Sequence, residues 1–329
     1  MLDLDRLERV RLRGRPVGQL IVGNLGLALD YRFPKKTEIV LEGAAEHIPC
    51  KGGVFLAMNH TDRYNYWPFQ YAMYRAGLPF TATWVKGKYY ENRLVGAFMD
   101  SMNNIPLPSR GYVIATEFRK RAGRPPTNAE YRVLRDLVDG KKTPSEALGV
   151  SSGDLAAFIA PEGGPEHFLA RFDALFDRML HRVVDLNRQA IEELGLNVLV
   201  FPEGTRSQRL GKGLNGLAQI TQYLGAPIVP VGCNGSDRLY PGNSPFSKGG
   251  RVTYRVGPPL LVDGPELASL RVPRSDVLPF SKEAAARYGQ RYDVITRVVM
   301  DRINDLLDPA YRRTEDEATL AEQGVGRFL

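Results

Sequence analysis

The chain has 329 residues, of which 43% are hydrophobic and 25% are charged, a composition typical of a globular protein that excludes extensive disorder. Its net charge of +7 favours anionic partners such as nucleic acid, lipid headgroups or phosphorylated substrates. No nucleic-acid-binding module is recognisable, so we do not expect nucleic acid among the partners. The two cysteines, Cys50 and Cys233, form no disulfide framework and no metal-binding spacing, which suits a reducing cytoplasm.

Residues 1–35 form a basic and apolar segment that we expect to lie close to a membrane. Five arginines occur within residues 2–16, and an apolar stretch follows from Val17 to Leu29. This combination suits a helix lying on an anionic membrane surface, or else a solvated helix that packs on the domain through its apolar side. The stretch is too short and too polar to span a bilayer.

Short apolar runs alternate with helical patterns in the first part of the main domain, which we place at residues 36–310. The predicted strands are Glu38–Glu42, Val54–Met58 and Thr81–Lys86, and the predicted helices are Tyr66–Arg75 and Leu94–Met102. Ile105–Arg110 contains two prolines and is therefore predicted to be an edge strand or an extended loop.

Residues 111–195 are predicted to be a largely helical insertion. Thr143 begins a segment typical of a helix start. From Pro165 to Leu194, apolar residues recur every three or four positions, which predicts one long amphipathic helix.

The alternation of strands and helices resumes after the insertion. Strands are predicted at Asn197–Phe201, Pro227–Gly232 and Arg251–Gly257, with a helix over Leu214–Leu224. The first of these strands is apolar enough to be buried on both faces, and the last alternates in the manner of an outer strand. The fold class is therefore α/β, with a single mixed sheet flanked by helices. Residues 311–329 form a polar tail, expected to be a loosely held helix.

Two polar motifs follow predicted strands. Asn59 and His60 come directly after the first buried strand, where open α/β sheets place their chemistry. Phe201–Ser207 reads Phe-Pro-Glu-Gly-Thr-Arg-Ser and presents a carboxylate, a guanidinium and two hydroxyl groups on one turn. Arg206 suits bidentate binding of a phosphate, and Glu203 suits either a sugar or glycerol hydroxyl or an ion pair with Arg206. The alternatives are a structural histidine and a surface ion pair.

Together these motifs resemble the glycerolipid acyltransferase family, specifically its lysophosphatidic acid acyltransferase group. The resemblance rests on Asn59-His60, on Phe201–Ser207 and on Ile228–Val231, and it covers about residues 38–260. It implies an acyltransferase-like fold, to which this chain adds the helical insertion. It also implies an acyl donor, acyl-coenzyme A or acyl carrier protein, as co-substrate, without a further cofactor or a metal.

The resemblance assigns a role to each matching residue. His60 becomes the general base that takes a proton from the acceptor hydroxyl as that hydroxyl attacks an acyl thioester. Glu203, Gly204, Thr205 and Arg206 become the site for the phosphate end of the acceptor. Histidine has an ordinary pKa near 6.5 and suits base catalysis at neutral pH, which contributes roughly 100- to 10,000-fold to rate.

The chain departs from the family pattern at three places. Asn65 stands where the family has an aspartate, and it can accept the same hydrogen bond from His60 without contributing a charge. Ile105–Arg110 matches the second family motif loosely. Arg110 is expected to be a further phosphate contact, and Asn59 is also expected to bind substrate. The connection to the Phe201–Ser207 motif is longer than usual, and its role as a lid, an acyl-chain wall or a partner surface is open.

The expected function is transfer of a fatty acyl group to a hydroxyl of a lysophospholipid such as 1-acyl-glycerol-3-phosphate, a step of phospholipid biosynthesis. The expected location is the cytoplasmic face of a membrane, with the protein bound peripherally to the lipid surface. Two alternatives remain. The acceptor could be another lipid, such as a glycolipid or an ornithine-type lipid, or the chain could be a non-catalytic lipid-binding protein.

Overall fold

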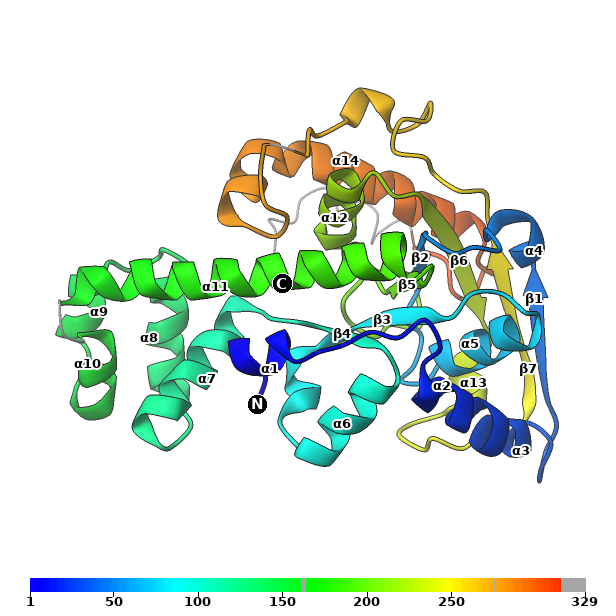
Figure 1. Ribbon diagram of the computed structural model, residues 1–329, viewed down its shortest axis with the longest axis horizontal. Coiled ribbons are helices and arrows are strands. Elements are labelled where there is room, and N and C mark those ends of the chain that lie inside the picture. Colours follow the sequence, from blue (N-terminus) through cyan, green and yellow to red (C-terminus); the bar gives the residue numbers. More distant parts are fainter. Residues whose placement is uncertain (161–163, 275, 315–329) are drawn as a thin grey trace. The chain divides into compact units, whose positions relative to one another are not determined.

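The computed structural model describes residues 1–160, 164–274 and 276–314 (Figure 1). The chain divides into two compact units. Unit 1 consists of Met1–Arg11, Val85–Asp100 and Ile105–Asp185, and unit 2 of Leu12–Trp84, Ser101–Asn104 and Leu186–Leu329. The predicted helical insertion lies mostly in unit 1. The helix expected in the polar tail falls almost wholly outside the described residues.

A seven-stranded sheet with the order β1-β7-β6-β2-β5-β3-β4 organises the α/β part of the chain. Its strands are β1 (Thr37–Glu42), β2 (Phe55–Met58), β3 (Thr81–Lys86), β4 (Asn104–Leu107), β5 (Asn197–Val200), β6 (Ile228–Asn234) and β7 (Gly250–Val256). β2, β3, β5 and β6 run parallel, whereas β7 is antiparallel to β6 and parallel to β1. The sheet is therefore mixed, as predicted.

The order of the strands confirms two predictions and corrects one. β4 ends the sheet, a place that suits its Pro106, and every residue of β5 is buried. The prediction of an outer strand at Arg251–Gly257 was wrong, because β7 lies between β1 and β6. The alternation in β7 shows that one of its faces is buried and the other partly exposed, and it says nothing about the position of the strand in the sheet order.

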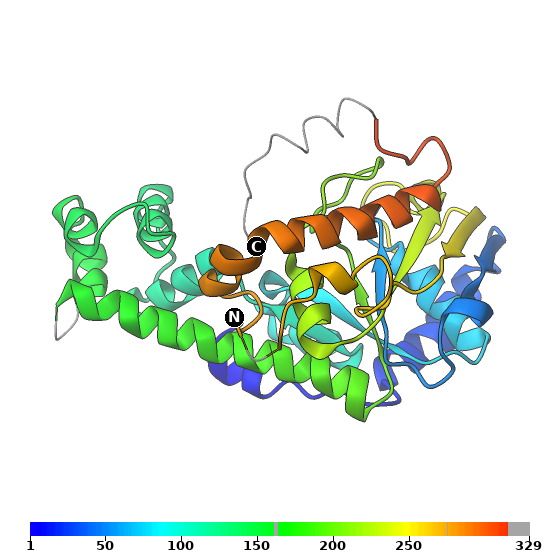
Figure 2. The same cartoon turned by 90° about the horizontal axis from the view of Figure 1, so that it is seen from above.

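Helices of unit 2 cover both faces of the sheet (Figures 1 and 2). α5 (Tyr66–Arg75) lies on one face, where its buried Phe69 and Met73 pack with Leu56 and Met58 of β2. α12 (Gly216–Leu224) and α14 (Lys282–Asp305) lie on the other face, α14 against β6. α12 ends at Gly225, as predicted, and this glycine adopts the left-handed conformation; α14 was not predicted.

Unit 1 is largely helical. Its elements are η2 (Gly87–Tyr90), α6 (Arg93–Ser101), α7 (Arg110–Ala122), α8 (Asn128–Val138), α9 (Pro144–Gly149), α10 (Gly153–Ile159) and α11 (Pro165–Arg188), which continues into η3 (Gln189–Glu193) of unit 2. Thr143 caps α9 through a capping box, which confirms the predicted helix start. Phe158 packs edge-to-face with Phe118 on one side and Phe168 on the other, and these rings join α7, α10 and α11.

The N-terminal segment is only partly helical. α1 covers Leu4–Glu8 alone, and residues 10–16 are not helical, so the arginine-rich part and the apolar stretch do not form one continuous helix. The apolar stretch forms α2 (Val17–Ile21), η1 (Val22–Leu27), a π-helical turn, and α3 (Ala28–Asp30). Two short elements complete the chain: α4 (Ala44–His47) and α13 (Ser236–Leu239), with the 3-10 turn η4 (Ala268–Leu270) before α14. Within the part of the chain that the structure describes, no helix combines the length and the apolarity needed to cross a membrane.

Candidate active site

The two sequence motifs meet because β2 and β5 are parallel neighbours. Ala57 of β2 is paired with Val200 of β5. His60 and Glu203 each follow their paired residue by three positions, so both leave the sheet at the same level of the same edge. The expectation that His60 lies at the carboxyl end of a buried strand is thereby confirmed.

Asn59 joins the end of β2 to β6. Its Nδ2 donates to the carbonyl oxygen of Cys233 at 3.0 Å, and its Oδ1 accepts from the Cys233 N–H at 2.7 Å. The Asn59 side chain is buried, with 2% of the residue exposed. Asn59 was predicted to bind substrate. In the structure, both polar atoms of its side chain bond to the backbone of the neighbouring strand β6, and these bonds fix the backbone that carries His60.

Asn65 holds the imidazole of His60 and determines its tautomer. The Asn65 Nδ2 donates to the carbonyl oxygen of Asn59 at 2.8 Å, so its Oδ1 faces the Nδ1 of His60, at 3.1 Å. An amide oxygen only accepts, hence the proton of His60 lies on Nδ1 and the basic nitrogen is Nε2. Tyr254 also donates its hydroxyl to the Asn65 carbonyl oxygen, at 2.6 Å.

The turn after β5 holds His60 from the other side. We call Phe201–Ser207 the β5 turn. The ring of Phe201 stacks on the imidazole, with ring centroids 4.1 Å apart and an angle of 20° between the planes. The Glu203 Oε2 accepts from the His60 N–H at 2.8 Å, and the His60 carbonyl oxygen accepts from the Ser207 N–H at 2.9 Å. This turn therefore orients the predicted base as well as carrying Arg206.

Both oxygens of the Glu203 carboxylate are engaged by backbone donors. Besides the His60 N–H, the carboxylate accepts from the Gly211 N–H, through Oε1 at 2.9 Å. The residue is 5% exposed, and this burial raises the pKa of its carboxyl, against the two hydrogen bonds, which lower it. Binding of a substrate hydroxyl by Glu203 stays a prediction, whereas its contact with the His60 backbone is a feature of the structure.

Gly204 separates a buried half of the β5 turn from an exposed half. Its φ of +64° lies in the left-handed region, and a Cβ at this position would come within 2.7 Å of the Leu214 side chain. Beyond Gly204, the chain is exposed at Thr205, Arg206 and Ser207. Among the described residues, none forms a hydrogen bond or an ion pair with the guanidinium of Arg206. Arg206 therefore has the accessibility that binding a phosphate requires.

Two residues of the site, Phe201 and Tyr254, were not singled out from the sequence, and Asp62 was considered only as the nearest carboxylate to His60, expected to point elsewhere. Phe201 was part of a recognised motif, but no sequence pattern predicts that its ring stacks on His60. Tyr254 lies 189 positions after Asn65, and only the sheet brings them together. Asp62 accepts from the Tyr64 N–H at 2.8 Å and from the Thr61 hydroxyl at 2.9 Å, and these bonds shape the turn between His60 and Asn65.

Arg110 begins α7 in unit 1, and its contacts there are extensive. The guanidinium forms an ion pair with Asp173 and donates to the Val138 carbonyl oxygen at 3.1 Å. It also lies over the rings of Phe172 and Phe176. These contacts join α7, α8 and α11, and a phosphate contact through Arg110 stays a prediction.

Comparison with known proteins assigns the family. A search of curated proteins found no match. The crystal structure of the 1-acyl-sn-glycerophosphate (LPA) acyltransferase PlsC from Thermotoga maritima is similar to this chain at 17% sequence identity and a TM-score of 0.40, over 86% of this chain and 79% of that one. A family model described as Acyltransferase matches residues 40–234, more than half of the sequence, and the chain therefore belongs to the acyltransferase family.

Proposed function

We propose that this acyltransferase moves a fatty acyl group from a thioester donor, acyl-coenzyme A or acyl carrier protein, to a hydroxyl of a lysophospholipid such as 1-acyl-glycerol-3-phosphate. The observation that carries the proposal is the imidazole of His60, whose Nδ1 is held by Asn65 and whose ring is held by Phe201. The same turn that supplies Phe201 exposes the guanidinium of Arg206.

The proposed reaction needs no covalent enzyme intermediate. The Nε2 of His60 takes the proton of the acceptor hydroxyl while the hydroxyl oxygen attacks the carbonyl carbon of the thioester. The new C–O bond forms, the C–S bond breaks, and the leaving thiolate takes the proton back from Nε2. Because the reacting nitrogen must be the unprotonated one, the tautomer set by Asn65 is the one that the mechanism requires.

Arg206 and Thr205 are the proposed contacts for the phosphate of the acceptor. A guanidinium binds a phosphate through two parallel N–H donors, and the exposed hydroxyl of Thr205 adds a third donor on the same turn. We assign Glu203 to the support of the His60 backbone, as its two hydrogen bonds favour. Long-chain donors and acceptors are amphiphiles, so we further propose that the protein works at the cytoplasmic surface of a bilayer.

The test is release of free thiol from long-chain acyl-coenzyme A, measured with lysophosphatidic acid and then with other lysolipids as acceptors. His60→Ala should reduce acceptor-dependent release by roughly 100- to 10,000-fold. The matched control is His47→Ala, since His47 lies in α4, outside the site, and this variant should keep full activity.

The acceptor series also separates the alternatives. Release that depends on a glycolipid or an ornithine-type lipid would preserve the chemistry and change the acceptor. Absence of release with every acceptor and with both donors would contradict the proposal. Binding of a lysolipid that survives His60→Ala would then identify a lipid-binding protein, which the neutral Asn65 beside His60 would fit.

A further inference from the structure

The N-terminal helical segment of unit 2 exposes large apolar side chains at every fourth position. The exposed fractions are 46% for Val17, 55% for Ile21, 66% for Leu25, 61% for Leu29 and 71% for Phe33. We call these five residues the apolar row. The π-helical turn η1 lies in the middle of the segment and has more residues per turn than an α-helix, so a spacing of four keeps Val17, Ile21, Leu25 and Leu29 on one side. Phe33 follows the end of α3 at Asp30.

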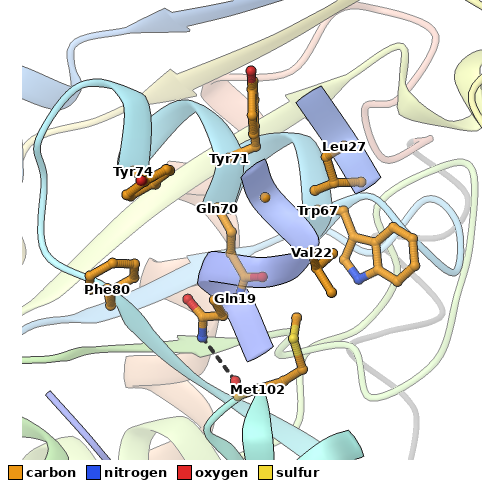
Figure 3. Close-up of a pocket in the computed structure, with 10 residues that line it drawn as sticks. Gln19, Val22, Leu27, Trp67, Gln70, Tyr71, Tyr74, Phe80 and Met102 are labelled. Atoms are coloured by element: carbon orange, nitrogen blue, oxygen red, sulfur yellow. Dashed lines mark hydrogen bonds between the residues drawn. The ribbon is translucent and has the colours of Figure 1, made fainter. Parts of the chain in front are cut away.

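The opposite side of this segment is fixed to unit 2. Gln19 is buried and its Nε2 donates to the carbonyl oxygens of Thr81 and Met102, at 2.7 and 2.9 Å. Figure 3 shows Gln19 beside Met102, with Gln70 of α5 directly above it. The cavity there, about 20 Å³, has room for roughly one water molecule and excludes a lipid. The apolar row is thus the outer side of an anchored segment.

Positive charge flanks the apolar row at both ends. Arg13 and Arg15 precede it, and Arg32, Lys35 and Lys36 surround or follow Phe33, all of them exposed. Within the described ranges, no ion pair is found for these five side chains. Asp30 lies between the two groups, but its carboxylate accepts from the Ser247 N–H and is only partly exposed.

A groove beside the row carries the same combination of charge and apolar surface. It has a volume of about 720 Å³ and is lined by Ile39 and Leu41 of β1, by residues of α5, and by the cations Arg32, Lys36 and Arg75. Arg75, like the others, has no ion pair among the described residues. An anionic headgroup would find three cations here next to apolar side chains.

We propose that the apolar row, with its basic ends and the adjoining groove, is a docking face for an anionic bilayer surface. Apolar side chains enter the boundary between headgroups and acyl chains, while flanking arginines and lysines contact anionic headgroups. The cations at both ends of a narrow row favour a charged lipid surface over an apolar protein groove. This inference rests on the bilayer location given in the proposed function and deepens it, because it names the surface that makes the contact; it uses none of the residues assigned to the reaction.

The first experiment changes the apolar row. The natural chain should sediment together with vesicles of phosphatidylcholine mixed with phosphatidylglycerol. Leu25→Gln/Leu29→Gln should lower the partition coefficient between vesicles and water by at least about tenfold. The matched control is Leu261→Gln/Val294→Gln, which removes two exposed apolar side chains elsewhere in unit 2 and should bind as the natural chain does. Equal binding by both double variants and the natural chain would overturn the proposal.

The second experiment changes the charge. Arg32→Gln/Lys35→Gln/Lys36→Gln should weaken binding to the mixed vesicles by roughly 100-fold, at about 1 kcal/mol per cation. The control Lys51→Gln/Arg297→Gln should have a much smaller effect. The natural chain should bind vesicles of phosphatidylcholine alone weakly and lose affinity for the mixed vesicles as salt is added. Binding that is indifferent to headgroup charge would contradict the proposal.

Leu25→Trp reports insertion directly and does not depend on a loss of binding. Its fluorescence should shift to shorter wavelength when mixed vesicles are added, and Leu261→Trp should show no such shift. Acyl transfer to a short-chain, water-soluble acceptor should be unchanged in Leu25→Gln/Leu29→Gln, so failure of docking and failure of the proposed reaction give different results. A Leu25→Trp shift caused by another protein but not by vesicles would assign the face to a protein partner and overturn the proposal.

Discussion

The loop after β2 and the exposed half of the turn after β5 differ in how their polar groups are used. From Asn59 to Asn65, the side chains of Asn59, Asp62 and Asn65 are buried and each makes hydrogen bonds within the protein. From Thr205 to Ser207 the side chains face solvent. A base needs a fixed orientation and one tautomer, whereas a residue that binds a charged substrate must stay accessible until the substrate arrives. The difference therefore separates positioning from recognition.

The largest effect in this comparison is expected at Arg206. Arg206→Ala removes the accessible guanidinium and should lower kcat/KM for a phosphate-bearing acceptor by roughly 10- to 100-fold, mainly through KM, since charge-assisted hydrogen bonds contribute about 1.5–3 kcal/mol. Arg206→Lys should recover only part of this loss, because an ammonium group cannot bind bidentately. Steady-state kinetics with varied acceptor measures both.

Arg209 provides the control for Arg206. It lies three residues later, is exposed, and donates to the Arg312 carbonyl oxygen. Arg209→Ala removes one positive charge from the same stretch without removing the proposed phosphate contact. Equal increases of KM in Arg206→Ala and Arg209→Ala would indicate general attraction by charge and would contradict a specific site.

Glu203→Gln should affect kcat, and much less the KM for the acceptor. The carboxylate accepts from two N–H groups, but an amide has only one acceptor atom, so the variant leaves either the His60 N–H or the Gly211 N–H facing an NH₂ group. The cost is about 1–3 kcal/mol, and the misplaced imidazole should lower kcat by roughly tenfold. A rise in KM with unchanged kcat would place Glu203 in the acceptor site instead.

Asn65→Asp should not improve the enzyme, although it introduces the residue that the resemblance implies at this position. The Nδ2 of Asn65 donates to the Asn59 carbonyl oxygen, and a carboxylate would place an oxygen against that carbonyl at about the same separation, 2.8 Å. The residue is fully buried, so we expect a loss of about 1–3 kcal/mol in the free energy of unfolding and no gain in kcat. Urea denaturation and thiol release measure the two quantities, and a gain in kcat would show that the site retained the family arrangement.

The smallest effect is a dependence of stability on pH from the buried carboxyls. Burial raises the pKa of Glu203 and of Asp62 above the ordinary range. Between the ordinary and the raised pKa, the folded chain binds more protons than the unfolded chain, so the free energy of unfolding should decrease as pH rises through this window. Urea denaturation from about pH 4 upward measures the slope, and Glu203→Gln should make it shallower. An unchanged slope would exclude Glu203 as a source.

The local elements and the two motifs could be predicted from the sequence. Apolar runs bounded by glycine determined the buried strands, and the recurrence of apolar residues at three and four positions determined the long helix α11. His60 and Arg206 were identified because their residue types and their place after buried strands are local properties. The family followed from the same strings, as the match over residues 40–234 bears out.

Only the tertiary structure decided how the site is held together. The pairing of Ala57 with Val200 puts Glu203 on the backbone of His60, and no local pattern encodes the register between two strands about 140 residues apart. The position of β7 in the strand order was predicted wrongly for the same reason. Alternation of apolar and polar residues shows that one face of a strand is less buried than the other, but it does not show which strands lie beside it. The side-chain amide of Asn65 fits its place because it meets the Asn59 carbonyl oxygen and the His60 Nδ1, while the Tyr254 hydroxyl, from a strand far along the chain, donates to the Asn65 backbone carbonyl oxygen. These groups come together only in the folded chain.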